Sequence, residues 1–162
     1  MKYAGIGSRE TPEDICKLMT RIAEYLYQQG YTLRSGAADG ADTAFENGAK
    51  EKKEIYLPWR RFNNSDARFV KIPDEAYKIA ANFHPVWDRL KDYAKNFHAR
   101  NVMQILGEDL NTPSDFVVCW TKKGRITGGT GQALRMAIAY EIPIFNLAIE
   151  EDKQRILAVI GE

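Results

Sequence analysis

The sequence predicts an α/β fold, a single Rossmann-like domain with three layers and a mainly parallel sheet. Two observations lead to this prediction. Short apolar segments typical of buried strands alternate with segments whose apolar residues have helical spacing. Glycine-rich turns follow several of the apolar segments, as they do where parallel strands lead into helices. The 162 residues suit one domain, so we expect residues 1–162 to fold as a unit.

The first third of the chain alternates most regularly. Thr11, Pro12 and Asp14 are typical of a helix start, and apolar residues at helical spacing continue until Gly30 ends the helix. A Gly/Ala/Asp turn at 35–42 leads into a second helix. The expected strands are 3–6, 31–34 and 54–57, and the second helix is 41–50.

The remainder of the chain is less regular but continues the same pattern. A polar loop is expected at 59–73, and a glycine-rich loop at 124–131. Strands are expected at 115–120 and 142–147, and helices at 74–82, 86–106, 132–140 and 150–160.

Charge and cysteine content restrict the function and the location. The chain has 23 Lys and Arg against 22 Asp and Glu, a net charge of +1, which disfavours strong non-specific binding to nucleic acids or anionic membranes. The net charge does not exclude a local basic patch on the surface. The two cysteines, Cys16 and Cys119, form no CxxC pair, and no apolar stretch approaches 18 residues. We therefore expect a cytoplasmic protein without membrane contact.

Three turns of small residues are the candidate ligand-binding elements. Parallel strands present such turns at one edge of the sheet, where glycines expose main-chain N–H groups and helix starts attract anions. The alternative is that the glycines only shape tight turns. The candidate residues are Gly7, Ser8 and Arg9 in the first turn, Ser35, Gly36 and Gly40 in the second, and Gly128, Gly129, Thr130, Gly131 and Gln132 in the third.

Several common sites are absent from the sequence. The 35–42 turn lacks the GK[ST] ending of a P-loop, and no acidic residue closes the second strand as in NAD-dependent dehydrogenases. His84 and His98 have no neighbouring thiol or carboxylate that would complete a metal site. We expect no metal and no cofactor. Trp59, Phe62 and Trp120 follow strand ends and are candidates either for base stacking or for ordinary packing.

The second turn carries a family resemblance. Ser35-Gly36-x-Ala38-x-Gly40-x-Asp42, followed by Ala44 and Gly48-Ala49, resembles the signature of DNA-processing protein A and its relatives. That family also has an early glycine turn that ends in Arg, as Gly7-Ser8-Arg9 does here.

A later part of the chain resembles the Lonely Guy phosphoribohydrolases. Their H-x-R-K helix and P-G-G-x-G-T-x-x-E motif are similar to His98-Ala99-Arg100-Asn101 and to Gly128–Gly131. Both families belong to the SLOG superfamily. The resemblance implies a small nucleotide whose phosphate binds at Gly128–Gly131, a catalytic role for Arg100 in cleavage, and a homo-oligomer. Asn101, next to Arg100, is a candidate either to hydrogen-bond a base or to cap a polar helix face.

Three positions depart from the phosphoribohydrolase pattern, because the family's Pro, Thr and Glu fall on Thr127, Gln132 and Arg135. Arg135 stands where those enzymes have the Glu that serves cleavage, and a guanidinium would oppose a developing ribosyl cation. Asp42, Asp39 or Glu10 would have to replace that carboxylate.

Three functions follow from these patterns. The chain binds a nucleotide as a sensor or a sequestering protein, cleaves nucleoside 5′-monophosphates as an N-glycosidase with a different carboxylate, or binds single-stranded nucleic acid as DNA-processing proteins do. The first is preferred because the glycine turns are intact and the family's Glu is missing.

Overall fold

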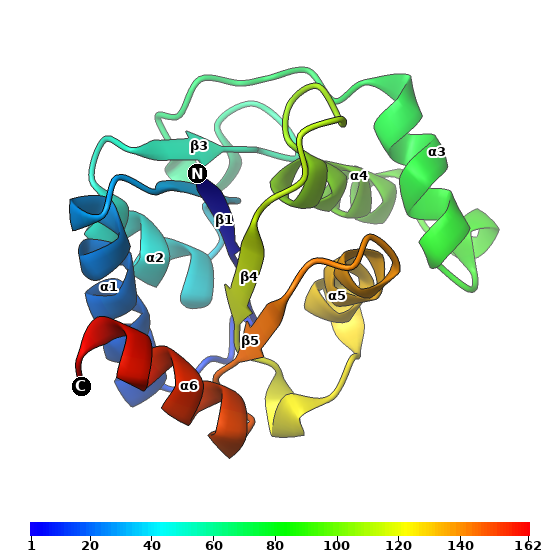
Figure 1. Cartoon of the computed structure of the whole chain (residues 1–162). Helices are drawn as coiled ribbons and strands as arrows, with labels where there is room; N and C mark the ends of the chain where they lie inside the picture. Colours follow the sequence, from blue (N-terminus) through cyan, green and yellow to red (C-terminus); the bar gives the residue numbers. More distant parts are fainter.

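A computed structural model describes residues 1–162, and its centre is a sheet of five parallel strands (Figure 1). The strand order β3-β2-β1-β4-β5 confirms the predicted α/β class. The strands are β1 (Lys2–Gly5), β2 (Thr32–Ser35), β3 (Lys53–Ile55), β4 (Phe116–Cys119) and β5 (Ile144–Asn146). The order changes direction between β1 and β4, where doubly wound sheets bind ligands at the carboxyl ends of the strands.

Six α-helices cover the two faces of the sheet (Figure 1). One face carries α1 (Glu13–Gln28), α2 (Ala41–Ala49) and α6 (Glu150–Ile160), and the other carries α3 (Asp74–Phe83), α4 (Asp92–Leu106) and α5 (Gly128–Ala139). None of the helices combines the length and the apolar character that crossing a membrane requires.

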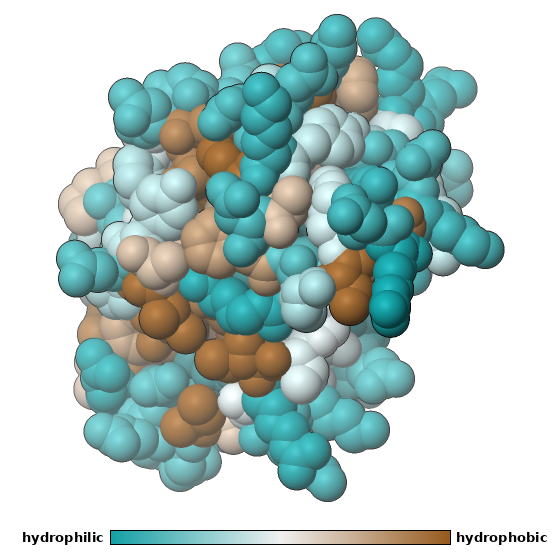
Figure 2. Space-filling view, turned by 90° about the vertical axis from the view of Figure 1, so that its right-hand side faces the viewer, coloured by the Kyte–Doolittle hydropathy of each residue, from teal (hydrophilic) through white to brown (hydrophobic).

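Each face of the sheet has its own apolar core because successive strand residues point to opposite sides. Tyr3 of β1 and Val118 of β4 pack with α1 and α2, whereas Ala4 and Val117 pack with α4 and α5. Strand β4 is a continuous apolar run because both of its faces are covered, whereas β2 and the edge strand β3 also carry charged residues. Figure 2 shows that apolar side chains on the surface near α3 and α5 are interspersed with hydrophilic ones.

Two helix starts differ from the sequence prediction. Helix α4 begins at Asp92 rather than at residue 86, because Trp87–Arg89 forms a separate 3₁₀ turn and Lys91 has extended backbone (ψ 160°). The Trp87 ring lies against the ring of His98, so this turn folds back onto α4. Helix α5 begins at Gly128, so the predicted glycine loop is the first turn of a helix.

Candidate functional site

A cleft of about 650 Å³ lies at the carboxyl ends of the strands. Residues from all three predicted glycine turns line it, together with one side of α4 and the segment after β4. The cleft therefore sits at the place where a doubly wound sheet changes strand order.

The turn after β1 supplies one wall of the cleft. Gly7 is glycine because a Cβ there would press against Ala41 of α2 and the main chain of Trp120. The N–H of Ser8 donates to the oxygen of Trp120 at 3.2 Å, which fixes the turn beside β4. Gly7, Ser8 and Arg9 all line the cleft as the sequence predicts, and Arg9 is exposed.

The start of α5 supplies the opposite wall and has no neutralising group of its own. Thr127 forms no side-chain cap, and the N–H of Gly131 is the first to bond back, to the oxygen of Thr127 at 3.0 Å. The N–H groups of Gly128, Gly129 and Thr130 therefore have no partner within the helix. Each of the other five α-helices has an acidic residue in its first turn, and α5 has none. The positive end of the α5 dipole consequently faces the cleft.

Protein packing does not require a glycine at Gly129. A Cβ built there would meet no atom within 4 Å, and the residue is exposed and lines the cleft. The space left by the missing side chain is open to a ligand, which could approach the main chain closely.

Two cations at the cleft have no carboxylate partner. Arg9 and Lys122 both line it, both are exposed, and neither belongs to an ion pair. The guanidinium carbon of Arg9 lies 5.7 Å from the centre of the Phe97 ring. Glu10 is the exposed acid nearby. The rim of the cleft thus offers positive charge that the protein itself does not use.

Arg100 forms part of the cleft floor, but most of its hydrogen bonds are internal. It is 4% exposed, and its Nη1 donates to the oxygens of Gly36 (2.7 Å) and Tyr56 (2.9 Å). Its Nε donates to Oδ1 of Asn101 at 2.8 Å. Burial lowers the pKa of Arg100 to about 10, so the group stays charged at neutral pH. Arg100 therefore ties the turn after β2 to the end of β3 while it lines the cleft.

Asp42 faces the same floor from the first turn of α2. Its Oδ2 accepts from the N–H of Ala38 at 3.2 Å. Burial raises its pKa to about 6, against the opposing effects of the Arg100 charge and the Ala38 hydrogen bond. Asp39, the other predicted carboxylate of this turn, does not line the cleft, and its Oδ1 accepts from Nδ2 of Asn63 at 2.9 Å.

Three further predicted residues lie behind the cleft. Ser35 is fully buried, and its hydroxyl donates to the oxygen of Gly5 at 2.6 Å. A Cβ at Gly36 would collide with the side-chain amide of Gln104. Gly40 lies against the main chain of the first turn. Ser35, Gly36 and Gly40 therefore shape the floor from behind rather than line it. Gly131 is also outside the lining, because it packs against the main chain of Ile126.

Gln132 and Arg135 on α5 face α3 instead of the cleft. Nε2 of Gln132 donates to the oxygen of Ala80 at 2.8 Å, and its Oε1 accepts from Nη2 of Arg135 at 2.8 Å. Nε of Arg135 donates to the oxygen of Phe83 at 3.2 Å. The guanidinium that stands in place of the family's Glu is therefore engaged elsewhere and does not line the cleft.

The aromatic residues at the cleft are not those that the sequence analysis singled out. Phe97 and Tyr93 of α4 line it, and Tyr93 is 59% exposed. Trp59 and Phe62 instead pack behind Phe97, with ring centres 5.2 and 5.3 Å away. The four-residue spacing of Tyr93 and Phe97 along α4 indicates one helix face but not whether that face is exposed or buried.

Asn101, His98 and Gln104 complete the α4 side of the cleft. Nδ2 of Asn101 lies 3.5 Å from the oxygen of Gly129. His98 is held neutral because burial lowers its pKa to about 4. Gln104 is 2% exposed and was not predicted. The sequence feature that could have identified Gln104 is that it is the one polar residue in the apolar run 102–106, one helical turn after Arg100.

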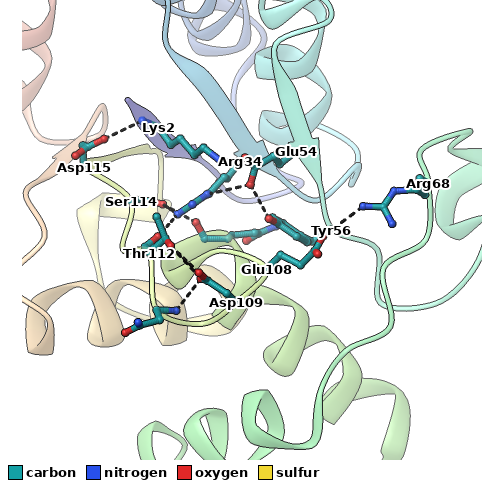
Figure 3. Close-up of polar contacts among 12 residues, drawn as sticks. Lys2, Arg34, Glu54, Tyr56, Arg68, Glu108, Asp109, Thr112, Ser114 and Asp115 are labelled. Carbon is teal, nitrogen blue, oxygen red and sulfur yellow. Dashed lines mark hydrogen bonds and ion pairs between the residues drawn. The ribbon is translucent and has the colours of Figure 1, made fainter.

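A second and larger cavity, of about 830 Å³, lies beside β2 and β3 (Figure 3). Its central group is Arg34, which is 1% exposed. Nη1 of Arg34 donates to the oxygen of Thr112 (2.6 Å) and to Oγ of Ser114 (3.1 Å), and Nε donates to Oε1 of Glu54 (3.3 Å). Arg34 thus clamps β2 to the segment between α4 and β4.

The other charged groups of this larger cavity are also satisfied (Figure 3). Glu54 accepts from the Tyr56 hydroxyl at 2.6 Å and pairs with Lys2. Burial works to raise the pKa of Glu54, but the hydrogen bonds from Lys2 and Tyr56 and the Arg34 charge lower it overall. The remaining pairs are Lys53 with Glu46, Arg68 with Glu108, Glu51 with Tyr27, and Asp109 with Thr112.

Comparison with known proteins supports the fold and goes no further. No protein-family model matches the sequence, and no curated protein matches it. A solved structure of DNA processing protein A from Helicobacter pylori, described for its single-stranded DNA binding mode, is similar with a TM-score of 0.61 at 20% identity. The match covers 90% of this chain and 64% of that one, so the chain spans less than two thirds of its neighbour. The chain has the α/β fold of that DNA-processing protein.

Proposed function

We propose that the cleft binds a small nucleotide, with a phosphate group at the start of α5. The observation that carries this proposal is the helix start itself, whose free N–H groups lie in a cleft beside two unpaired cations, Arg9 and Lys122. Free N–H groups and the helix dipole favour an anion there, and no acidic residue of the first turn competes for the place.

The rest of the cleft suits the remainder of a nucleotide. Phe97 and Tyr93 offer aromatic surface on which a base can stack, and Arg9 lies near the Phe97 ring. Asn101 and Gln104 offer amide groups between this wall and the start of α5. A volume of about 650 Å³ lies within the usual range for small-ligand sites.

The test uses two variants of Gly129. Gly129→Asp places a carboxylate at the helix start, where it favours the helix but repels a phosphate. Gly129→Asn has nearly the same size without the charge. We expect Gly129→Asp to remain folded and to lose binding of nucleoside monophosphates in calorimetric titration, with a much smaller loss for Gly129→Asn. Equal affinity in Gly129→Asp and the original protein would show that the start of α5 does not bind the phosphate.

A second candidate function is the binding of single-stranded DNA. It is favoured by the structural similarity to DNA processing protein A, whose solved structure concerns that ligand. The same phosphate contacts would then hold one nucleotide of a strand. Affinity that rises with oligonucleotide length and falls steeply with added salt supports this candidate, whereas equal affinity for a mononucleotide and a long strand supports the first.

Hydrolysis and self-association stay predictions. Arg135 does not line the cleft, and Asp42 is the predicted carboxylate that does. Release of free base from nucleoside monophosphates, abolished in Asp42→Asn, would identify the protein as an N-glycosidase. The mass of the protein in solution tests the expected homo-oligomer.

A further inference from the structure

Gln104 is a buried amide on the floor of the cleft. It lies on α4 within the run Val102–Leu106, whose other members are apolar and fully buried. Only 2% of Gln104 is exposed, and the side chain lines the cleft. Its amide nitrogen lies against Gly36, where the missing Cβ makes room for it and for the Arg100 guanidinium.

The side-chain amide of Gln104 has no hydrogen-bond partner in the protein. Its main-chain oxygen accepts from Ser114, but no protein group bonds to its side-chain nitrogen or oxygen. A second buried glutamine provides the contrast. Gln132 is 0% exposed, and both ends of its amide are bonded, to Ala80 and to Arg135. The fully enclosed side-chain polar atoms without a partner are Tyr3 Oη and His98 Nδ1, so the Gln104 amide is open to the cleft and can meet a ligand there. An apolar side chain of the same length would therefore cost the fold little at position 104.

The position of Gln104 separates it from the phosphate wall. Asn101, three residues earlier on α4, is the residue whose amide lies near Gly129 at the start of α5. Gln104 lies about one helical turn further along, beside Gly36 at the end of β2. A neutral amide with two donors and one acceptor atom suits groups that both donate and accept hydrogen bonds rather than a phosphate charge.

We propose that Gln104 is a specificity-determining residue that hydrogen-bonds the part of the ligand remote from its phosphate. This inference rests on the proposed nucleotide function. It identifies which part of the ligand the floor of the cleft recognises. The group recognised carries a donor and an acceptor side by side. Sugar hydroxyls and the polar edge of a base both have this chemistry, and the experiment distinguishes them.

The test compares Gln104→Met with Gln132→Met. Methionine keeps the length and flexibility of glutamine but removes the amide. Titrations use AMP, its 2′-deoxy form, ribose 5-phosphate and inorganic phosphate, and thermal unfolding is measured for each variant. We expect Gln104→Met to bind AMP roughly tenfold more weakly, to bind inorganic phosphate as before, and to unfold at the same or a higher temperature. Gln132→Met should unfold at a lower temperature because it removes the hydrogen bonds that Gln132 makes with Arg135 and with the Ala80 oxygen.

The ligand panel assigns the recognised group. A comparable loss for ribose 5-phosphate identifies the sugar hydroxyls, and a loss that needs the base identifies its edge. Unchanged AMP affinity in Gln104→Met, or a lower unfolding temperature like that of Gln132→Met, overturns the inference while the proposed function stands. If the original protein binds none of these probes, the proposed function fails and the inference fails with it.

Discussion

The two cavities of this protein differ in how their charges are compensated. The larger one is lined by many ionic groups, yet each of its cations is paired with a carboxylate of the same chain. The smaller one contains two unpaired cations and an uncapped helix start. Volume alone would select the larger cavity rather than the cleft that we propose as the site. Uncompensated polar groups are the better guide to a ligand site because a ligand can satisfy them, whereas paired groups would have to be separated first.

The largest expected effect comes from breaking the compensated cavity. Arg34→Ala removes the clamp between β2 and the segment before β4 and leaves Glu54 with one cation fewer. We expect a loss of about 3 kcal/mol in the free energy of unfolding, measured by urea denaturation. Affinity for nucleoside monophosphates should be unchanged in the folded variant. A loss below about 1 kcal/mol would show that the network is not a structural clamp.

Asp42 provides a pH-dependent prediction for the other cavity. Its pKa is raised by burial to about 6 in the folded protein, so the folded state binds its proton more tightly than the unfolded state does. The charged carboxylate therefore costs stability above pH 6, and the cost disappears as the pH falls below about 4. Asp42→Asn should be more stable than the original by about 2 kcal/mol at pH 7 and equally stable near pH 4.

Denaturation of both proteins at several pH values checks this difference. Taking the difference between the two removes the contributions of other titrating groups, such as His98. A constant difference between pH 4 and pH 7 would contradict the raised pKa.

Removing one unpaired cation should affect binding but not folding. Lys122→Gln takes away a positive charge that has no partner in the protein. We expect roughly tenfold weaker binding of nucleoside monophosphates, a smaller difference at high salt, and an unchanged free energy of unfolding. Lys53→Gln at the larger cavity, where Glu46 is the partner, is the matched control and should leave the affinity unchanged. Equal affinities of Lys122→Gln and Lys53→Gln for nucleoside monophosphates would show that Lys122 does not contact the ligand.

The smallest expected effect is a gain in stability at the start of α5. Gly129→Ala reduces the freedom of the unfolded chain, and its Cβ meets no protein atom. We expect unfolding to become harder by about 0.5 kcal/mol, together with weaker nucleotide binding. A loss of stability would mean that the fold itself needs this glycine.

The sequence was informative wherever the signal is local. Strand and helix periodicity predicted the α/β class, and glycine turns after apolar strands predicted which loops meet at the carboxyl edge. Periodicity gave the wrong start for α4. Residues 86–91 have the apolar spacing of a helix, but they form a separate 3₁₀ turn that packs back onto α4 through Trp87 and His98.

The sequence could not show how side chains choose their partners. Arg34 and Thr112 lie far apart in the chain and meet only in the folded protein, so the clamp has no sequence pattern. Gln132 follows the glycine turn directly, yet the helical twist directs it to α3. Gln104 differs from Gln132 in lining the cleft and in having no side-chain partner, and only the structure shows either difference.

The central position of β1 has a consequence for how the cleft is assembled. Tyr3 of this first strand pairs with Leu33 on one side and with Phe116 on the other. The first pairing closes a short loop, whereas the second must bring together residues more than a hundred positions apart, at a higher entropic cost. The cleft lies between the ends of β1 and β4, so it exists only after that long-range pairing. A folding intermediate with only the first three strands would have two of the three glycine turns and no cleft.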